Sequence, residues 1–565
     1  MKLAELARAH GQGIDYQAVS FDYERSSDQD AATPVRHPVV VVGAGPVGMS
    51  LAIDLAQQGV RVVLLDNDCK LSVGSRAICF AKRTLEIFDR LGCGSRMVDK
   101  GVSWNVGKVF FRQEQIYGFN LLPESGHERP AFINLQQYYA EGYLAERVAE
   151  LPLIDLRWKH AVTGVQPQGD HVVVTVDTPE GPYTLEAGYL IACDGSRSPV
   201  RGMIGQESQG RVFRDRFLIA DVKMKPGGFP TERWFWFDPP FHPHQSVLLH
   251  RQPDDVWRID FQLGWEADPE EAKKPENVIP LVKALLGEDV PFELEWVSVY
   301  TFSCLRMPAF RHGRVIFAGD SAHLVSPFGA RGANSGVQDA ENLAWKLATV
   351  LRGQAGEALL DSYGTEREYA ADENLRNSTR ATDFITPKSE VSRLFRDAVL
   401  DLAKDHPFAR SLVNSGRLSM PATLDASPLN TPDADRFEGR MRPGAPAADA
   451  PVTVDGQPGW LLRQLQGSRF AALVFDGPAA QTQIATLRAA AEGLAALDVL
   501  LVGEAARAVD GALGVVDAEG LVAQRYDAQP GTVYLLRPDQ HVCARWRQPS
   551  ADAVRTALRR ALALH

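Results

Sequence analysis

The pattern of apolar and polar positions divides the chain into segments of different character. Residues 1–36 are polar and form an N-terminal extension. They are followed by an apolar run, a glycine-rich turn, an apolar helical stretch and a second apolar run, which together span residues 38–66. This succession predicts two parallel strands joined by a crossover helix. Segments 171–177 and 183–195 predict a hairpin that returns to a buried strand.

Residues 210–305 have a different pattern. Short runs such as FLIADVKM, RWFWFD and VWRIDFQL are separated by turn signals, among them DPPFHPH. This is typical of an antiparallel sheet. We therefore expect a separate lobe inserted into one discontinuous domain, which consists of residues 37–209 and 306–420.

The last part of the chain predicts a third unit. Residues 421–458 are rich in Pro, Ala and Asp, which indicates a linker. Short apolar strands alternate with Ala-rich helices over residues 459–565. The predicted fold class is therefore α/β: a Rossmann-like domain, an antiparallel-sheet lobe and a small C-terminal α/β domain. A chain of 565 residues has room for these units.

Composition narrows the range of partners. The formal net charge of -11 disfavours nucleic acid, which is bound through basic patches. We find neither a signal peptide nor an apolar run of membrane-spanning length, so we expect a cytoplasmic protein without a membrane partner. Six cysteines lack CxxC or zinc-site spacing, which predicts reduced thiols and no metal site.

The sequence GAGPVG at residues 43–48 follows the first apolar run and opens the predicted helix. Gly43 permits a tight turn, Gly45 lets the backbone approach a pyrophosphate, and Gly48 lets helix and strand pack closely. Asp66 ends the second strand, where a carboxylate can accept the ribose hydroxyls. The unit predicts a dinucleotide site but does not by itself separate NAD from FAD.

Two later segments indicate FAD rather than NAD as the bound dinucleotide. ACDGSRSPVR (192–201) and RVIFAGDSAHLVSPFGARGANSGVQDAENLAWKLA (314–348), together with GAGPVG, resemble the single-component FAD-dependent aromatic hydroxylases. These share the para-hydroxybenzoate hydroxylase fold, and the most similar branch contains phenol, 3-(3-hydroxyphenyl)propionate and polyketide hydroxylases. The resemblance spans about residues 37–420. The tail resembles that branch's thioredoxin-like domain but has no CxxC, so thiol redox activity is not implied.

The resemblance assigns site residues by motif. Pro327 matches the proline beside the reactive edge of the flavin. Gln137 fits a family glutamine near the ribityl chain better than Gln136 does, because Glu141 and Leu144 lie four and seven residues on. The implied FAD-binding residues are Gly43, Gly45, Pro46, Val47, Gly48, Asp66, Arg76, Gln137, Asp194, Gly195, Gly319, Asp320, Gly329, Gly332, Ala333 and Asn334.

One position departs from the family pattern. Arg331 lies in GARGAN, where the family has a Gly-Gly or Gly-Gln pair before the asparagine. It either adds a positive charge near the flavin ring or points to solvent. We expect the second, because most arginines are exposed.

The resemblance also implies a reaction. NADH or NADPH reduces FAD, O2 forms a flavin C4a-hydroperoxide, and a phenolic substrate attacks its terminal oxygen. The protein must supply a dry cavity and accept the phenol's proton or a strong hydrogen bond. We take Trp236 and Arg258 as substrate-binding candidates and His250 as a catalytic candidate. The alternatives are a core aromatic, a surface strand residue and a satisfied sheet histidine.

Other functions remain open at this point. The same fold could carry a dehydrogenase, a halogenase or a Baeyer–Villiger oxygenase, since fold does not determine chemistry. A non-catalytic binding protein is a further alternative. The C-terminal domain could mediate a homodimer or only brace the FAD domain.

Overall fold

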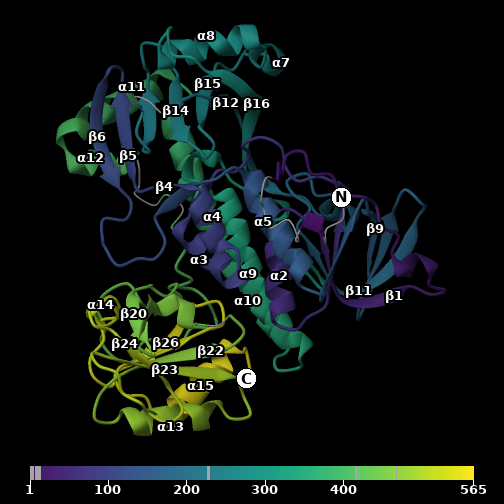
Figure 1. Ribbon diagram of the computed structural model, residues 1–565, viewed down its shortest axis with the longest axis vertical. Coiled ribbons are helices and arrows are strands. Elements are labelled where there is room, and N and C mark those ends of the chain that lie inside the picture. Colours follow the sequence, from purple (N-terminus) through teal and green to yellow (C-terminus); the bar gives the residue numbers. More distant parts are fainter. Residues whose placement is uncertain are drawn as a thin grey trace.

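The computed structural model describes residues 5–6, 14–225, 229–413, 418, 420–465 and 467–564, and these are built around three large sheets (Figure 1). Residues 1–4 and 7–13 of the expected N-terminal extension lie outside the described residues. The remainder of the extension packs on the first domain: Phe21 stacks on Trp158 with ring centroids 4.5 Å apart. The 3-10 helix η1 (Ser27–Asp30) then leads to the first strand.

The first sheet contains the predicted β-α-β unit. Strand β1 (Val35–Val42) pairs in parallel with β2 (Val62–Asp66), and helix α2 (Pro46–Gln57) connects them. The valines over 39–42 are buried, and helix α2 packs against β1 and β2. The other strands are β8 (Ile154–Trp158), β9 (Ala161–Pro167), β10 (Val172–Asp177), β11 (Tyr183–Ala192), β17 (Arg311–His312) and β18 (Val315–Phe317).

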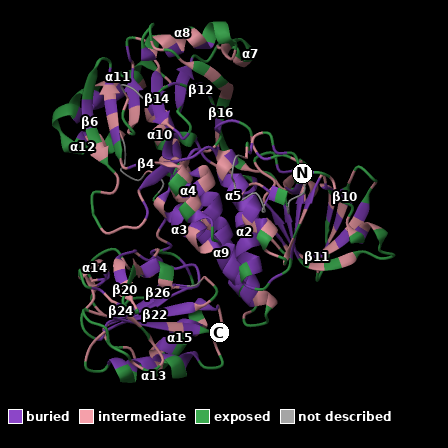
Figure 2. Ribbon diagram, viewed as in Figure 1, coloured by how far each residue is buried: buried purple, intermediate pink, exposed green. Residues whose placement is uncertain are grey.

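Strands β10 and β11 form the predicted hairpin, which is antiparallel. Helix α9 (Gly332–Leu351) packs along α2 and is buried over most of its length (Figure 2). The neighbouring helices are α3 (Lys82–Leu91), α4 (Gly94–Lys100), α5 (Gln137–Glu150), α6 (Pro199–Met203) and α10 (Ala358–Ile385). A small sheet of β3 (Cys79–Ala81), β7 (Phe132–Asn134) and β4 (Val102–Trp104) lies between the first two domains.

The second sheet differs from the expected lobe in two ways. Its order is β19-β16-β12-β15-β14-β13-β5-β6, so two strands come from residues 106–120 rather than 210–305. Strand β5 pairs with β13 in parallel, so the sheet is not wholly antiparallel. Strands β5 and β6 form an antiparallel hairpin, and this hairpin covers an edge of β13 that would otherwise be unpaired. The bounds are β5 (Val106–Phe111), β6 (Glu114–Asn120), β12 (Gln209–Lys223), β13 (Arg233–Phe237), β14 (Ser246–Arg251), β15 (Val256–Leu263), β16 (Glu293–Arg306) and β19 (His323–Leu324).

Strand periodicity gives this sheet two different faces. On β15, Trp257 and Ile259 pack toward α8 (Pro275–Leu286), which follows the short helix α7 (Pro269–Ala272). Arg258 and Asp260 point to the opposite face, toward the first domain. Helices α10, α11 (Glu390–Asp405) and α12 (Pro407–Val413) contribute to the core on that face.

The third sheet belongs to the C-terminal domain and has the order β21-β20-β24-β23-β22-β25-β26. The segment that we expect to be a linker is partly built into it: β20 starts at Pro451, and Ala447 and Ala450 are buried in its core. Short Ala and Pro side chains gave that stretch the composition of a linker. The elements are β20 (Pro451–Val454), β21 (Gln457–Trp460), β22 (Phe470–Phe475), α13 (Ala480–Ala491), β23 (Leu497–Gly503), β24 (Leu513–Val516), α14 (Leu521–Arg525), β25 (Val533–Leu536), β26 (Val542–Trp546) and α15 (Ala551–Ala561).

Candidate active site

The predicted motifs meet at one edge of the first sheet. Val42 is paired with Ala192, and Ala192 with Phe317, so three parallel strands end at the same level. Gly43, Asp194 and Gly319 follow these ends, and Asp66 ends the neighbouring strand β2. In open α/β sheets, ligands bind in the crevice outside the carboxyl ends of the strands.

The three glycines of the first motif have different surroundings. A Cβ on Gly43, whose φ is +103°, would lie 2.4 Å from the carbonyl oxygen of Cys193, and one on Gly48 would lie 1.9 Å from that of Gly43. A Cβ on Gly45 would meet nothing within 4 Å. Gly45 is also the N-cap of α2, where no side chain caps the free N–H groups. This open helix end next to Pro46 and Val47 fits a pyrophosphate.

The GD motif is held against α2 and α9. A Cβ on Gly319 would lie 2.9 Å from Val47, and one on Gly336 of α9 would lie 2.6 Å from the same side chain. Asp339 of α9 accepts hydrogen bonds from the Gly319 N–H (3.0 Å) and from His323 Nε2 (2.6 Å). Although burial disfavours its charged form, His323 and Arg367 hold the pKa of Asp339 below its ordinary value.

Three carboxyl groups face the crevice. Asp66 accepts from the N–H groups of Ala44 (2.6 Å) and Asp68 (2.8 Å). Asp194 Oδ2 accepts from Val200 N–H at 3.0 Å, while its Oδ1 has no hydrogen-bond partner among the described residues. Asp320 has solvent-exposed surface in the crevice, although neighbouring protein atoms partly desolvate its carboxyl group. Desolvation raises the pKa of all three carboxyl groups.

Segment 74–77 forms the side of the crevice nearest the second sheet. Arg76 is exposed, and its carbonyl oxygen accepts from Arg258 Nη1 at 2.9 Å. Gln137 accepts from the Ala77 N–H at 3.0 Å and donates to Glu141 at 2.7 Å. Gly195 has a φ of +79° and open space around it.

Residues 327–334 lead into α9, and some of them lie beside side chains of the second sheet. Pro327 is exposed and begins the 3-10 helix η3 (Pro327–Gly329), and α9 starts at Gly332 and Ala333. The Asn334 side chain is occupied: it donates to the carbonyls of Cys79 and Ala330 and accepts from the Ala81 N–H at 2.8 Å. Asn334 therefore ties α9 to β3 through side-chain hydrogen bonds.

Arg331 does not point to solvent, which corrects our expectation. Only 6% of its surface is exposed, and its Nη1 donates to Asn374 Oδ1 at 3.0 Å. The reason is tertiary: Asn374 belongs to α10, which packs over the segment that carries Arg331.

A cavity of about 340 Å³ opens between the second sheet, η3 and helices α10 and α12. Its walls are mainly apolar, with aromatic side chains from β6, β13 and η3. It is lined by Lys108, Val109, Tyr117, Phe119, Arg233, Phe235, Phe237, Phe328, Gly329, Arg331, Asn377, Ser378, Arg380, Ala381, Ile385, Ser411, Leu412, Val413 and Leu418. Gly329 and Arg331 connect this cavity to the predicted flavin edge at Pro327.

The three sheet residues expected from the sequence lie outside this lining. Trp236 is in the core on the opposite face of β13, where it stacks on Phe110 at a centroid distance of 5.1 Å. His250 is 5% exposed; burial, together with Arg233 and Arg258, lowers its pKa well below the ordinary value, so the imidazole is neutral. Its Nδ1 has no partner within the described part of the chain.

Arg258 is buried and fastens the sheet to the first domain. It contacts both oxygens of Asp260, at 2.9 Å and 3.2 Å, and donates to the carbonyl of Ser75 at 2.5 Å. Asp221, its cross-strand neighbour, accepts from Ser75 Oγ at 2.7 Å. This cluster holds segment 74–76 at the crevice.

Several cavity residues were not singled out from the sequence. Arg233, Phe235 and Phe237 lie two positions apart on β13, so the strand period places them on the same face of the sheet. This spacing was the only indication in the sequence that they could line a common cavity. Tyr117 and Ser378 carry no such signal, because β6 and α10 are brought to the cavity only by folding. The Tyr117 hydroxyl and Ser378 Oγ are buried without a hydrogen-bond partner among the described residues.

Comparisons with known proteins agree with this geometry. The model of the "FAD binding domain" family matches residues 36–378. A 3-(3-hydroxy-phenyl)propionate/3-hydroxycinnamic acid hydroxylase of Mycolicibacterium smegmatis is 27% identical over 546 residues, 92% of each chain. A flavin-dependent monooxygenase of Mycobacteroides abscessus is 32% identical over 58% of this chain and 70% of its own.

Solved structures show the same fold. The flavin-dependent monooxygenase PieE, in complex with FAD and substrate, has a TM-score of 0.81 at 21% identity. Aklavinone-11 hydroxylase, with FAD and aklavinone, has a TM-score of 0.75 at 24% identity. Each comparison covers 94% of this chain and 100% of the other.

Two kinds of feature are absent from the described residues. No helix there combines the length and the apolar character needed to cross a membrane. Nor does this part of the chain hold a group of three or more His, Cys, Asp or Glu side chains placed to bind a metal ion.

Proposed function

This chain belongs to the FAD binding domain family, and from that premise we propose that it is an FAD-dependent monooxygenase that hydroxylates a phenolic substrate, with NADH or NADPH as reductant and O2 as oxidant. The observation that carries the proposal is the convergence of Gly45, Asp194 and Gly319 on one crevice, beside which lies a mainly apolar cavity. The dehydrogenase, halogenase and Baeyer–Villiger alternatives are not favoured, because the curated relatives named above are a hydroxylase and a monooxygenase.

The proposed FAD site follows from the residues at the crevice. The open helix end at Gly45 would bind the pyrophosphate and Asp66 the adenosine ribose, while Gly319 and Asp320 would face the ribityl chain. When bound, FAD supplies the hydride acceptor and the centre at which O2 is activated. The Asp339 contacts keep the GD segment in place as the cofactor binds.

The cavity would hold the phenol beside the flavin edge. Its aromatic walls exclude water, which protects reactive oxygen from loss as hydrogen peroxide. The phenol's hydroxyl needs a hydrogen-bond partner that increases the electron density of the ring. Tyr117 and Ser378 offer unpartnered hydroxyl groups within the cavity wall.

His250 remains our catalytic candidate on different grounds. Its neutral imidazole has an unpartnered Nδ1 that can accept a hydrogen bond from a hydroxyl group, although its lowered pKa disfavours full protonation at neutral pH. A His250→Ala variant that kept full hydroxylation without extra hydrogen peroxide would remove it from consideration.

The direct test mixes purified enzyme with NADH or NADPH and a panel of phenols, including 3-(3-hydroxyphenyl)propionate. Cofactor oxidation, O2 use and hydrogen peroxide are followed together. We expect one phenol to accelerate flavin reduction and O2 use with little peroxide. A colourless protein that does not take up FAD would contradict the proposal at its base.

Two sequence-based expectations accompany this function. We propose a cytoplasmic location, which is supported by six cysteines without a disulfide. We also propose a homodimer, in which the exposed apolar side chains Val391, Leu394 and Phe395 of α11 would be covered. Sedimentation of the purified protein tests the second point.

A further inference from the structure

One side chain in the cavity carries a charge without a counter-charge. Arg233, at the start of β13, lines the cavity, and its Nε is buried without a hydrogen-bond partner. Among the described residues, none forms a hydrogen bond or an ion pair with its guanidinium group. Burial lowers the pKa of Arg233, yet a guanidinium remains protonated in proteins.

The surroundings do not neutralise this charge. Asp260, the nearby carboxylate on the same face of the sheet, already has both oxygens in contact with Arg258. Lys108 is paired with Glu232 at 2.8 Å, and its ammonium group lies near Trp234. The lining of the cavity includes no Asp or Glu side chain.

Arg233 is only partly exposed, and a partly desolvated cation without an anion costs free energy that a bound anion can offset. The neighbour of Arg233 across the sheet adds no negative charge. Trp234 is paired with Leu249, so the next pair along the register places Arg233 opposite the neutral His250.

We propose that Arg233 is the anion anchor of this cavity and binds a carboxylate carried by a phenolic substrate. The proposal rests on the proposed function, since it names the substrate class of that same site. A guanidinium can bind both oxygens of a carboxylate at once. The substrate's ring would then lie among Phe235, Phe237 and Phe328, whose side chains line the same cavity.

The test compares two ligands that differ only in charge, 3-(3-hydroxyphenyl)propionate and its primary amide. Their binding to the FAD-loaded enzyme is measured by calorimetry, which does not require turnover. We expect Arg233→Gln to weaken binding of the carboxylate about 10- to 100-fold and to leave binding of the amide nearly unchanged. Arg233→Lys retains the charge but lacks the planar guanidinium group. Its affinity for the carboxylate is expected to lie between the affinities of the wild-type enzyme and of Arg233→Gln.

Arg380→Gln is the matched control, because Arg380 lines the same cavity but is exposed. We expect it to change binding of either ligand by less than about threefold, since exposed charges interact weakly through water. Equal weakening of the carboxylate and the amide by Arg233→Gln would overturn the proposal and leave Arg233 a role in cavity shape only. Unchanged binding of the carboxylate would also overturn it.

A second measurement does not depend on any ligand. Because the charge of Arg233 is uncompensated, Arg233→Met should leave the unfolding temperature of the ligand-free protein unchanged or raise it. A marked decrease would assign Arg233 a structural role and contradict the proposal. Failure of the proposed function is distinguishable, because the wild-type enzyme would then bind neither the carboxylate nor the amide.

Discussion

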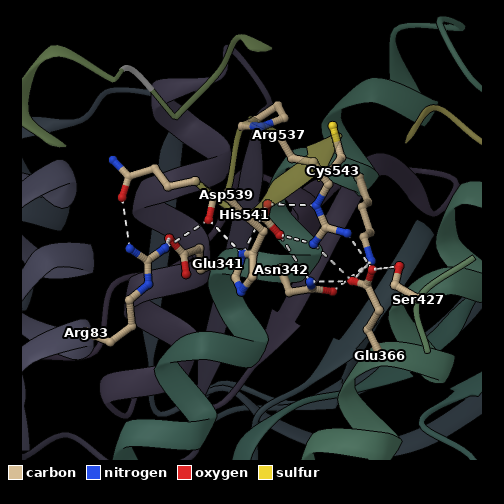
Figure 3. Close-up of polar contacts among 12 residues, drawn as sticks. Arg83, Glu341, Asn342, Glu366, Ser427, Arg537, Asp539, His541 and Cys543 are labelled. Carbon is tan, nitrogen blue, oxygen red and sulfur yellow. Dashed lines mark hydrogen bonds and ion pairs between the residues drawn. The ribbon is translucent and has the colours of Figure 1, made fainter. Parts of the chain in front are cut away.

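Glu366 and Arg537 form an ion pair from which water is fully excluded, although they belong to different domains. Arg537 donates to the two carboxylate oxygens of Glu366 at 2.5 Å and 3.1 Å, and neither side chain has exposed surface. Lys346 and Asn342 of α9 donate to the same carboxylate, at 2.6 Å and 2.7 Å (Figure 3). The C-terminal domain is thus joined to the two helices that support the flavin crevice.

Replacing Glu366 with Gln should destabilise the protein by about 3–5 kcal/mol, because it leaves the buried charges of Arg537 and Lys346 without this anion. Intrinsic tryptophan fluorescence can follow the transition in denaturant, and Trp345 contributes to it, because Trp345 is buried and packs edge-on against Phe470 of the C-terminal domain. Glu438→Gln is the control, since the pair of Glu438 with Arg436 is exposed, and its unfolding midpoint should not change. An equal midpoint for both variants would show that the buried cluster contributes nothing.

The same cluster predicts a loss of stability in acid. Arg537 and Lys346 outweigh burial and hold the pKa of Glu366 below its ordinary 4.5, and Arg537 and His541 similarly lower that of Asp539 below 3.8. A lowered folded-state pKa contributes stability above the unfolded-state pKa, and this contribution is lost as pH falls toward the folded-state value. We expect the unfolding temperature to decrease from about pH 5 downward. The decrease should be shallower in Glu366→Gln, and parallel curves would contradict the assignment.

Two glycine substitutions should separate cofactor binding from folding. Gly45→Ala places a Cβ in open space at the helix end, so the protein should fold with nearly wild-type stability but bind FAD at least about tenfold more weakly. Gly48→Ala places a Cβ 1.9 Å from the carbonyl oxygen of Gly43, so it should yield little folded protein. FAD titration and circular dichroism measure the two effects. Wild-type affinity in Gly45→Ala would place the pyrophosphate elsewhere.

Adjacent aromatic residues of β13 should respond differently to substitution. Phe235→Ala enlarges the cavity and should increase the fraction of O2 released as hydrogen peroxide, because water enters beside the flavin. Trp236→Phe alters the core on the opposite face and should lower the unfolding temperature while leaving that fraction unchanged. A rise in peroxide in Trp236→Phe alone would reverse the assignment of the two faces.

The sequence alone determined the β-α-β unit and the order of the flavin motifs. Both depend on local properties: the run of valines over 39–42, the period of the helix after it, and glycines at positions where a Cβ cannot fit. The β10–β11 hairpin was predictable for the same reason. Since the carboxyl ends of parallel strands share one edge, the meeting of Asp66 with the glycine turn also followed from the pattern.

Only the tertiary structure decided which side chains reach the cavity. Strands β5 and β6 join the second sheet from a distant part of the chain, and this places Tyr117 in the cavity wall. Burial of Arg331 depends on α10 packing over it. The guanidinium group of Arg233 has no carboxylate partner because Arg258 already contacts both oxygens of Asp260. Such features depend on contacts between segments far apart in sequence, which hydrophobic periodicity within one segment cannot specify.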